Sequence, residues 1–154
     1  MAERVGSGED ADMPELEDLA DVSNVLLLAP SMGSQGSDAC VDLLTRTAPD
    51  RTNVLAVTFT RSPAEWADHW TDHVGQPPSR GGIVGIGQMG GGVEDSSWAV
   101  KSVENPSDLT GIGIELSELL SGMATAAAED EEIVMCFNSV TSPLQYADLQ
   151  RAFR

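Results

Sequence analysis

The chain has 154 residues, the size of one domain, and its 25 Asp and Glu outnumber its 8 Lys and Arg, for a net charge of −17. Such an acidic surface, without any cluster of basic residues, argues against nucleic acids and anionic membranes as partners. The composition is typical of a protein from a salt-rich cytoplasm, where screening reduces the repulsion between like charges.

No segment of the sequence indicates export or membrane insertion. The apolar runs are far shorter than the ~20 residues that span a bilayer. The N-terminus, Met1-Ala2-Glu3, has no basic region followed by an apolar one, so it is not a signal peptide. Cys40 and Cys136 lie in apolar stretches without CxxC spacing, which predicts buried free thiols. We therefore expect a cytoplasmic protein.

The first part of the chain predicts a tail followed by a strand and a helix. Residues 1–22 are polar and acidic, and we expect a disordered segment ahead of a single domain over 23–154. The continuous apolar run at 25–28 predicts a buried parallel strand. A loop rich in Gly and Ser follows at 29–37, and the next segment, 38–47, is periodic like a helix.

The rest of the chain continues to alternate between strand and helix patterns. Further strands are predicted at 53–59, 83–87, 98–103 and 133–137. Pro63 opens a second helix, Ser107 or Asp108 caps a third, and Pro143 opens a last one over 144–153. This alternation predicts an α/β fold with a mostly parallel sheet flanked by helices on both faces. In such sheets ligands bind beyond the carboxyl ends of the strands. The loops at those ends are 29–37, 60–62, 87–95 and 138–142.

The loop at 29–37 stands where a nucleotide-hydrolysing domain carries its P-loop, GxxxxGK(S/T), whose lysine reaches the terminal phosphates. Aligned from Ala29, the lysine position is Gln35, and in the alternative register it is Ser37. Lys101 is the only lysine of the chain. Neither register therefore supplies the cation.

Four motifs occur in a characteristic order. They are Ala29-Pro30-Ser31, Val57–Thr60 with Ser62-Pro63 behind it, Asp108–Gly113 and Cys136–Thr141. Together they resemble KaiC-like proteins of the RecA superfamily, closest to the small haloarchaeal members, over residues 24–154. The resemblance implies a RecA/P-loop-like three-layer sandwich.

The same resemblance implies that ATP hydrolysis has been lost. In active relatives the strand matching 133–137 ends in an aspartate that holds magnesium, but here that position is Asn138, a poor ligand for a hard dication. The family's catalytic glutamate follows the second strand, and the nearest candidate is Glu65. We expect no catalytic residue, no metal and no enzymatic activity.

Loss of hydrolysis is not loss of nucleotide binding, so the loop is also considered as a degenerate nucleotide site. Its candidate residues are Ser31, Gly33, Ser34, Gln35, Gly36, Ser37 and Asn138. Glycines and the first amides of a helix can hold an anion, so residual ATP or ADP is the only cofactor considered. The alternative is a plain helix start in which Ser37 is the cap.

Other patterns are weaker. Residues 85–90 spell GxGxxG after a strand, but more glycine follows instead of a helix, which favours a flexible loop. His69 and His73 are spaced i, i+4, yet no third ligand is evident, which favours a solvated helix edge over zinc. The hydroxyl residues within 139–142 lack the GxSxG context of a nucleophile.

The C-terminal region raises a question of completeness. Relatives continue with a strand that inserts between the first strand and the one at 133–137, whereas this sequence ends at Arg154. Either the chain is a truncated form, or another chain completes the sheet, since open edges invite strand addition. Helix 144–153 also carries an apolar set.

Three functional hypotheses remain. We favour a non-catalytic regulatory or scaffold domain that binds a protein partner or itself through the C-terminal sheet edge and helix 144–153. The alternative is a nucleotide-binding sensor, with ATP or ADP at the 29–37 loop, without efficient hydrolysis. A third is an ATPase whose lysine comes from a partner chain.

Overall fold

The computed structural model describes residues 2–3, 16–19, 21–30, 32–87, 93–94 and 97–139. The chain divides into two compact units, residues 1–46 and residues 47–154, and each is described by itself. The predicted helix 144–153 and most of the predicted glycine loop lie outside the described residues.

The described residues of the first unit form four short elements: β1 (Ala2–Glu3), the 3-10 helix η1 (Leu16–Leu19), β2 (Val25–Leu26) and α1 (Gln35–Leu44). Strands β1 and β2 pair in parallel as a two-stranded sheet. The prediction of a buried strand over 25–28 was wrong, because only two residues are in strand and the side chains of Val25 and Leu28 are 41% and 55% exposed. The two-residue strand β1 is too short a neighbour to bury this apolar run.

The second unit contains the main sheet, formed by β3 (Thr52–Thr58), β4 (Arg80–Ile86), β5 (Trp98–Val103) and β6 (Glu132–Asn138). All its pairings are parallel, and the strand order is β5-β4-β3-β6. Four of the predicted strands are thereby confirmed, with boundaries shifted by up to three residues. The interior strands β3 and β4 are buried along nearly their whole length, as expected for strands covered on both faces.

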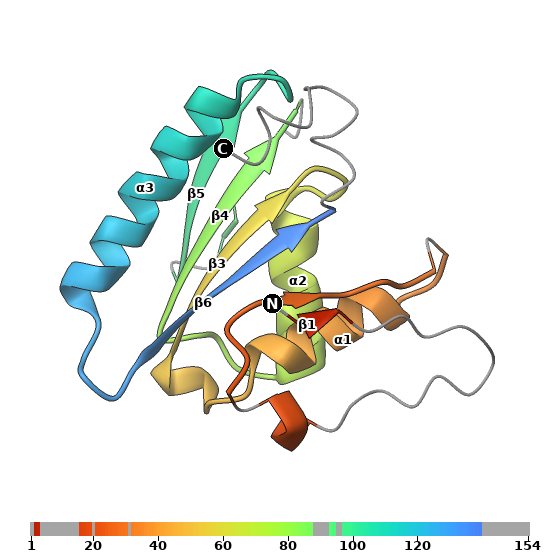
Figure 1. Ribbon diagram of the computed structural model, residues 1–154. Coiled ribbons are helices and arrows are strands. Elements are labelled where there is room, and N and C mark those ends of the chain that lie inside the picture. The colour runs from red at the N-terminus through yellow and green to blue at the C-terminus, as the bar shows by residue number, and fades with distance from the viewer. Residues whose placement is uncertain are drawn as a thin grey trace. The chain divides into compact units, whose positions relative to one another are not determined.

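Helices α2 (Pro63–Val74) and α3 (Leu109–Ala126) lie on opposite faces of this sheet (Figure 1). The path from β3 through α2 to β4 runs toward one edge, whereas the path from β5 through α3 to β6 runs back toward the other. Because such crossovers are right-handed, opposite directions place their helices on opposite faces. The second unit is therefore a three-layer α/β arrangement.

One core lies between α3 and the sheet. Five buried residues from β3, β4, β5 and α3 form its centre, and partly buried apolar side chains surround them. The centre is Val57, Val84, Ile86, Val103 and Ile112, and the surrounding side chains are Phe59, Leu109, Leu116 and Leu119. Ile112, Leu116 and Leu119 of α3 thus face the sheet.

The other core is aromatic and lies between α2 and the sheet. The rings of Trp66 and Trp70 both meet the ring of Trp98 edge-on, at centroid distances of 5.4 and 5.9 Å. The indole Nε1 of Trp70 donates to the carbonyl of Gln76 at 2.9 Å, so this fully buried ring leaves no polar atom unsatisfied. Gly81 allows the Trp98 ring to lie against the backbone of β4, where any Cβ would overlap it.

Local sequence signals define both ends of α2. Ser62 and Glu65 form a capping box around Pro63, the first helical residue, and Gly75 ends the helix with a φ of 85°. None of the helices in the described part of the chain is both long and apolar enough to span a membrane.

Candidate functional site

The start of α1 is the described half of the predicted nucleotide loop. The helix begins at Gln35, and its N-cap, Ser34, makes no side-chain capping hydrogen bond. The prediction that Ser37 caps the helix was wrong, because the helix begins two residues earlier and Ser37 lies within its first turn. Gly33 has a φ of +94°, a conformation that favours glycine. Ser31 lies outside the described residues.

The charge around this helix start does not favour phosphate. The first turn of α1 carries an acid, Asp38, and Gln35 and Ser37 supply no cation. Residues 32–35 are exposed to solvent. A bound anion would therefore depend on the backbone amides and the helix dipole alone.

Asn138, the other predicted part of the nucleotide site, is the last residue of β6. It pairs in register with Thr58, and its Oδ1 accepts a hydrogen bond of 3.5 Å from the hydroxyl of Thr60. The helix start of α1 belongs to the first unit and Asn138 to the second, so each half of the predicted site is described separately.

Glu65 serves as a helix cap. Its Oε2 accepts from the backbone N–H of Ser62 at 2.8 Å, and its own N–H donates to the Ser62 hydroxyl at 3.2 Å. The hydrogen bond from the Ser62 backbone N–H, followed by the Ser62 hydroxyl and the nearby charge of Arg61, lowers the pKa of the Glu65 carboxyl below its usual 4.5. The carboxylate is thus occupied at the helix start, and none of its described contacts indicates a catalytic role.

The remaining sequence patterns form no site among the described residues. The rings of His69 and His73 stack with centroids 6.0 Å apart, but no group of three metal-ligating side chains is found in the described part of the chain. After Gly87, which ends β4 with a φ of +93°, the next described element is strand β5. The GxGxxG pattern therefore does not lead into a described helix.

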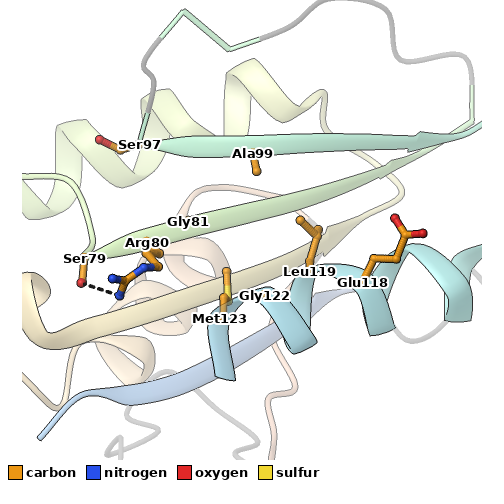
Figure 2. A pocket seen from close by; sticks show the side chains of 9 residues that line it. All are labelled: Ser79, Arg80, Gly81, Ser97, Ala99, Glu118, Leu119, Gly122 and Met123. Carbon is orange, nitrogen blue, oxygen red and sulfur yellow. Dashed lines mark hydrogen bonds between the residues drawn. The ribbon is translucent and has the colours of Figure 1, made fainter. Parts of the chain in front are cut away.

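A pocket of about 350 Å³ lies between α3 and the amino ends of β4 and β5 (Figure 2). It is lined by Ser79, Arg80, Gly81, Ser97, Ala99, Glu118, Leu119, Gly122 and Met123. The sequence pattern did not point to it, because ligands in parallel sheets bind at the opposite, carboxyl ends of the strands. Of the two glycines in its lining, only Gly122 leaves open space, since no atom lies within 4 Å of a Cβ at that position, whereas the Trp98 ring fills the Cβ position of Gly81.

The ionic groups on the pocket wall already have partners. Nη1 of Arg80 lies 2.9 Å from Oε2 of Glu131, and Glu118 lies 3.3 Å from the Nζ of Lys101. Glu131 also accepts from Asn53 at 2.9 Å and from Ser79 at 3.0 Å. The hydrogen bond from Asn53, followed by those from Ser79 and the charge of Arg80, lowers the pKa of the Glu131 carboxyl. These contacts tie the starts of β3, β4 and β6 together and give the pocket no obvious ligand.

The most unusual surface is an apolar row on β6, which we call the β6 row. It consists of Ile133, Met135 and Phe137, whose side chains are 36%, 54% and 38% exposed. By register with Leu55 and Val57, the row lies on the face that α3 covers over β3, β4 and β5. Phe137 meets the ring of Phe59 at 5.7 Å, at the border of the α3 core.

The four-stranded, all-parallel sheet with helices on both faces defines an α/β protein. More particularly, the chain belongs to the family of unknown function DUF7504, whose family model matches residues 22–154. No curated protein and no solved structure gives a significant match.

Proposed function

We propose that this protein is a non-catalytic, KaiC-like domain of the RecA superfamily that acts as a regulatory or scaffold module in a high-salt cytoplasm. The observation that carries the proposal is the position of Lys101, the only lysine of the chain. Lys101 lies on β5, where its Nζ is 3.7 Å from Glu115 and 3.3 Å from Glu118. It is engaged on the α3 face of the sheet rather than in the 29–37 loop, so the loop has no phosphate-binding lysine.

The residue at the position of the family's magnesium-binding aspartate supports the same proposal. Asn138 offers a neutral amide oxygen, which already accepts from Thr60, where an ATPase needs a carboxylate. Phosphoryl transfer consists almost entirely of positioning and charge neutralisation. A chain without the lysine and the carboxylate lacks both means of neutralising the transferred phosphate.

A function without catalysis requires a contact surface, and we propose that it includes the β6 edge. The β6 row exposes three large apolar side chains on one strand. Helix 144–153, whose predicted apolar set is the other part of the proposed contact surface, lies outside the described residues. The partner is another protein or a second copy of this chain.

The proposal is tested by measuring ATP turnover with magnesium in molar potassium chloride. We expect the rate of the wild type to equal that of Asn138→Ala and Ser34→Ala variants, and all three to equal the buffer blank. Hydrolysis that either substitution abolishes would show a functioning active site and refute the proposal.

The uncapped start of α1 favours a second candidate, a sensor that binds ATP or ADP without hydrolysing it. Because Ser34 makes no side-chain cap, backbone amides of the first turn remain available to an anion. Calorimetry with ATP and ADP in high salt should then give a binding signal. Ser34→Asp, which retains capping ability but adds a negative charge, should abolish it. No detectable heat at millimolar nucleotide would exclude this candidate.

A further inference from the structure

Strand β6 lies at an edge of the described sheet. All seven of its residues pair with β3, from Thr52 opposite Glu132 to Thr58 opposite Asn138. No other described strand pairs with β6. Its second edge therefore presents backbone N–H and C=O groups for which the described residues provide no ladder partner.

The sequence of β6 itself lacks the usual protection against strand addition. Natural edge strands carry charges, proline or bulges that discourage pairing. In β6 the only charged residue is Glu132, at its first position, and the strand contains no proline. The β6 row instead exposes apolar side chains at every second residue, which is the pattern of a strand that pairs and packs on one face.

The charge next to β6 determines how a second copy could approach. Residues 129–132 are four consecutive acids that lead into the strand. In a parallel pair the two acidic runs would lie side by side, which is unfavourable for like charges. In an antiparallel pair centred on Met135 they would lie at opposite ends, roughly 25 Å apart at ~3.3 Å per residue. That separation exceeds the Debye length of about 8–10 Å at moderate salt.

The same arrangement makes the β6 row self-complementary. Around a twofold axis through Met135, Ile133 of one copy lies opposite Phe137 of the other, on the same face of the sheet. Pairs of an aromatic and a β-branched residue are among the favourable cross-strand contacts. A twofold axis is also the commonest symmetry of soluble oligomers.

We propose that β6 pairs antiparallel with β6 of a second copy, around a twofold axis through Met135, and joins the two four-stranded sheets into one. This inference rests on the proposed protein-contact function and names its partner as an identical chain. The strand that pairs with the edge of β6 is thus β6 of the second copy, and its acidic run lies at the opposite end of the strand pair.

Disulfide trapping in the full chain tests the geometry. Met135→Cys should form a covalent dimer under mild oxidation by oxidised glutathione in molar potassium chloride. Directly opposite residues of an antiparallel pair have Cβ atoms ~4.5–5.5 Å apart, close to the spacing that a disulfide requires. The matched control is Ile114→Cys on α3, because Ile114 and Met135 are both 54% exposed. The wild type reports any background from Cys40 and Cys136.

Sedimentation equilibrium provides the second measurement. We expect the wild type and Ile114→Lys to be dimeric and Met135→Lys to be monomeric, with circular dichroism verifying that each variant is folded. A monomeric wild type, or equal cross-linking of the Met135→Cys and Ile114→Cys variants, would overturn the proposal. So would a monomer whose thiol at position 135 reacts slowly with Ellman's reagent, since another part of the chain would then cover the row. These measurements do not involve ATP turnover, so they test the dimer separately from the non-catalytic function.

Discussion

Glu131 connects three strands through a single carboxylate. One of its oxygens accepts from Asn53 on β3 and Arg80 on β4, the other accepts from Ser79, and β6 begins at the next residue. Asn53 is fully buried, so its amide depends on this acceptor and on the carbonyl of Glu132. A lone buried amide would be costly, and Glu131 removes that cost.

Glu131→Gln should therefore lower the melting temperature at neutral pH by several degrees. The pKa of this carboxyl is lowered from 4.5 in the native state, so the unfolded state takes up the proton first as the pH falls. The stabilisation is complete above the unfolded pKa and disappears as the pH falls through the native pKa. Melting curves from neutral to acid pH should thus converge for the variant and the wild type. Glu129→Gln, an equal charge change at an exposed residue, is the control, and equal effects of both variants would contradict the prediction.

The sequence predicts the structural role of some side chains but not of others. Ser62-Pro63-Ala64-Glu65 is a recognisable capping signature, since the box joins residues only three apart. The family resemblance nevertheless also offered Glu65 as a catalytic candidate, and the hydrogen bonds to Ser62 identify it as a cap. The pair of Arg80 and Glu131 could not be predicted, because its members are 51 residues apart.

At the level of elements, β4 and β5 are held together by a close approach between glycine and tryptophan. The Trp98 ring of β5 lies against Gly81 of β4, its partner in the strand register, and packs on α2 through Trp66 and Trp70. The glycine is required by packing, because the ring occupies the space of a Cβ atom.

Gly81→Ala should destabilise the protein by about 1–3 kcal/mol, the usual cost of overpacking a core. Gly113→Ala on α3 is the matched control, since no atom lies within 4 Å of a Cβ at that position. In an exposed helix this change should stabilise by up to about 1 kcal/mol. Urea unfolding of the two variants measures the difference. A Gly81→Ala protein as stable as the wild type would show that the tryptophan cluster shifts without cost.

Three similarly apolar runs of the sequence differ in how much of each forms a strand and in how deeply it is buried. The run at 133–137 is in strand β6, which pairs with β3 along its whole length, and the run at 53–59 became the buried strand β3. The run at 25–28 is just as apolar, yet only two of its residues are in strand and Leu28 is 55% exposed. Hydrophobicity predicts a strand, but neighbouring strands decide whether it is buried.

At the level of the whole molecule, the net charge of −17 sets the response to salt. Self-repulsion destabilises a compact, highly charged chain, and screening relieves it as the Debye length falls from about 10 Å at 0.1 M to about 3 Å at 1 M.

The melting temperature should therefore rise steeply as potassium chloride is raised to molar concentration. Sucrose, an uncharged osmolyte that also favours compact states, is the control, and it should stabilise far less in low-salt buffer. A melting temperature that is constant or falls with potassium chloride would contradict the screening argument.

The sequence by itself determined the local features of this protein: the alternation of strands and helices, the parallel α/β class, the start of α2 and the absence of a lysine from the loop before α1. Each of these depends on residues close together in the chain. Only the tertiary structure decided the strand order, the contacts of Glu131 and the exposure of the β6 row. The physical reason is that each of these depends on residues brought together from distant parts of the chain, and their spacing in sequence carries no record of that contact.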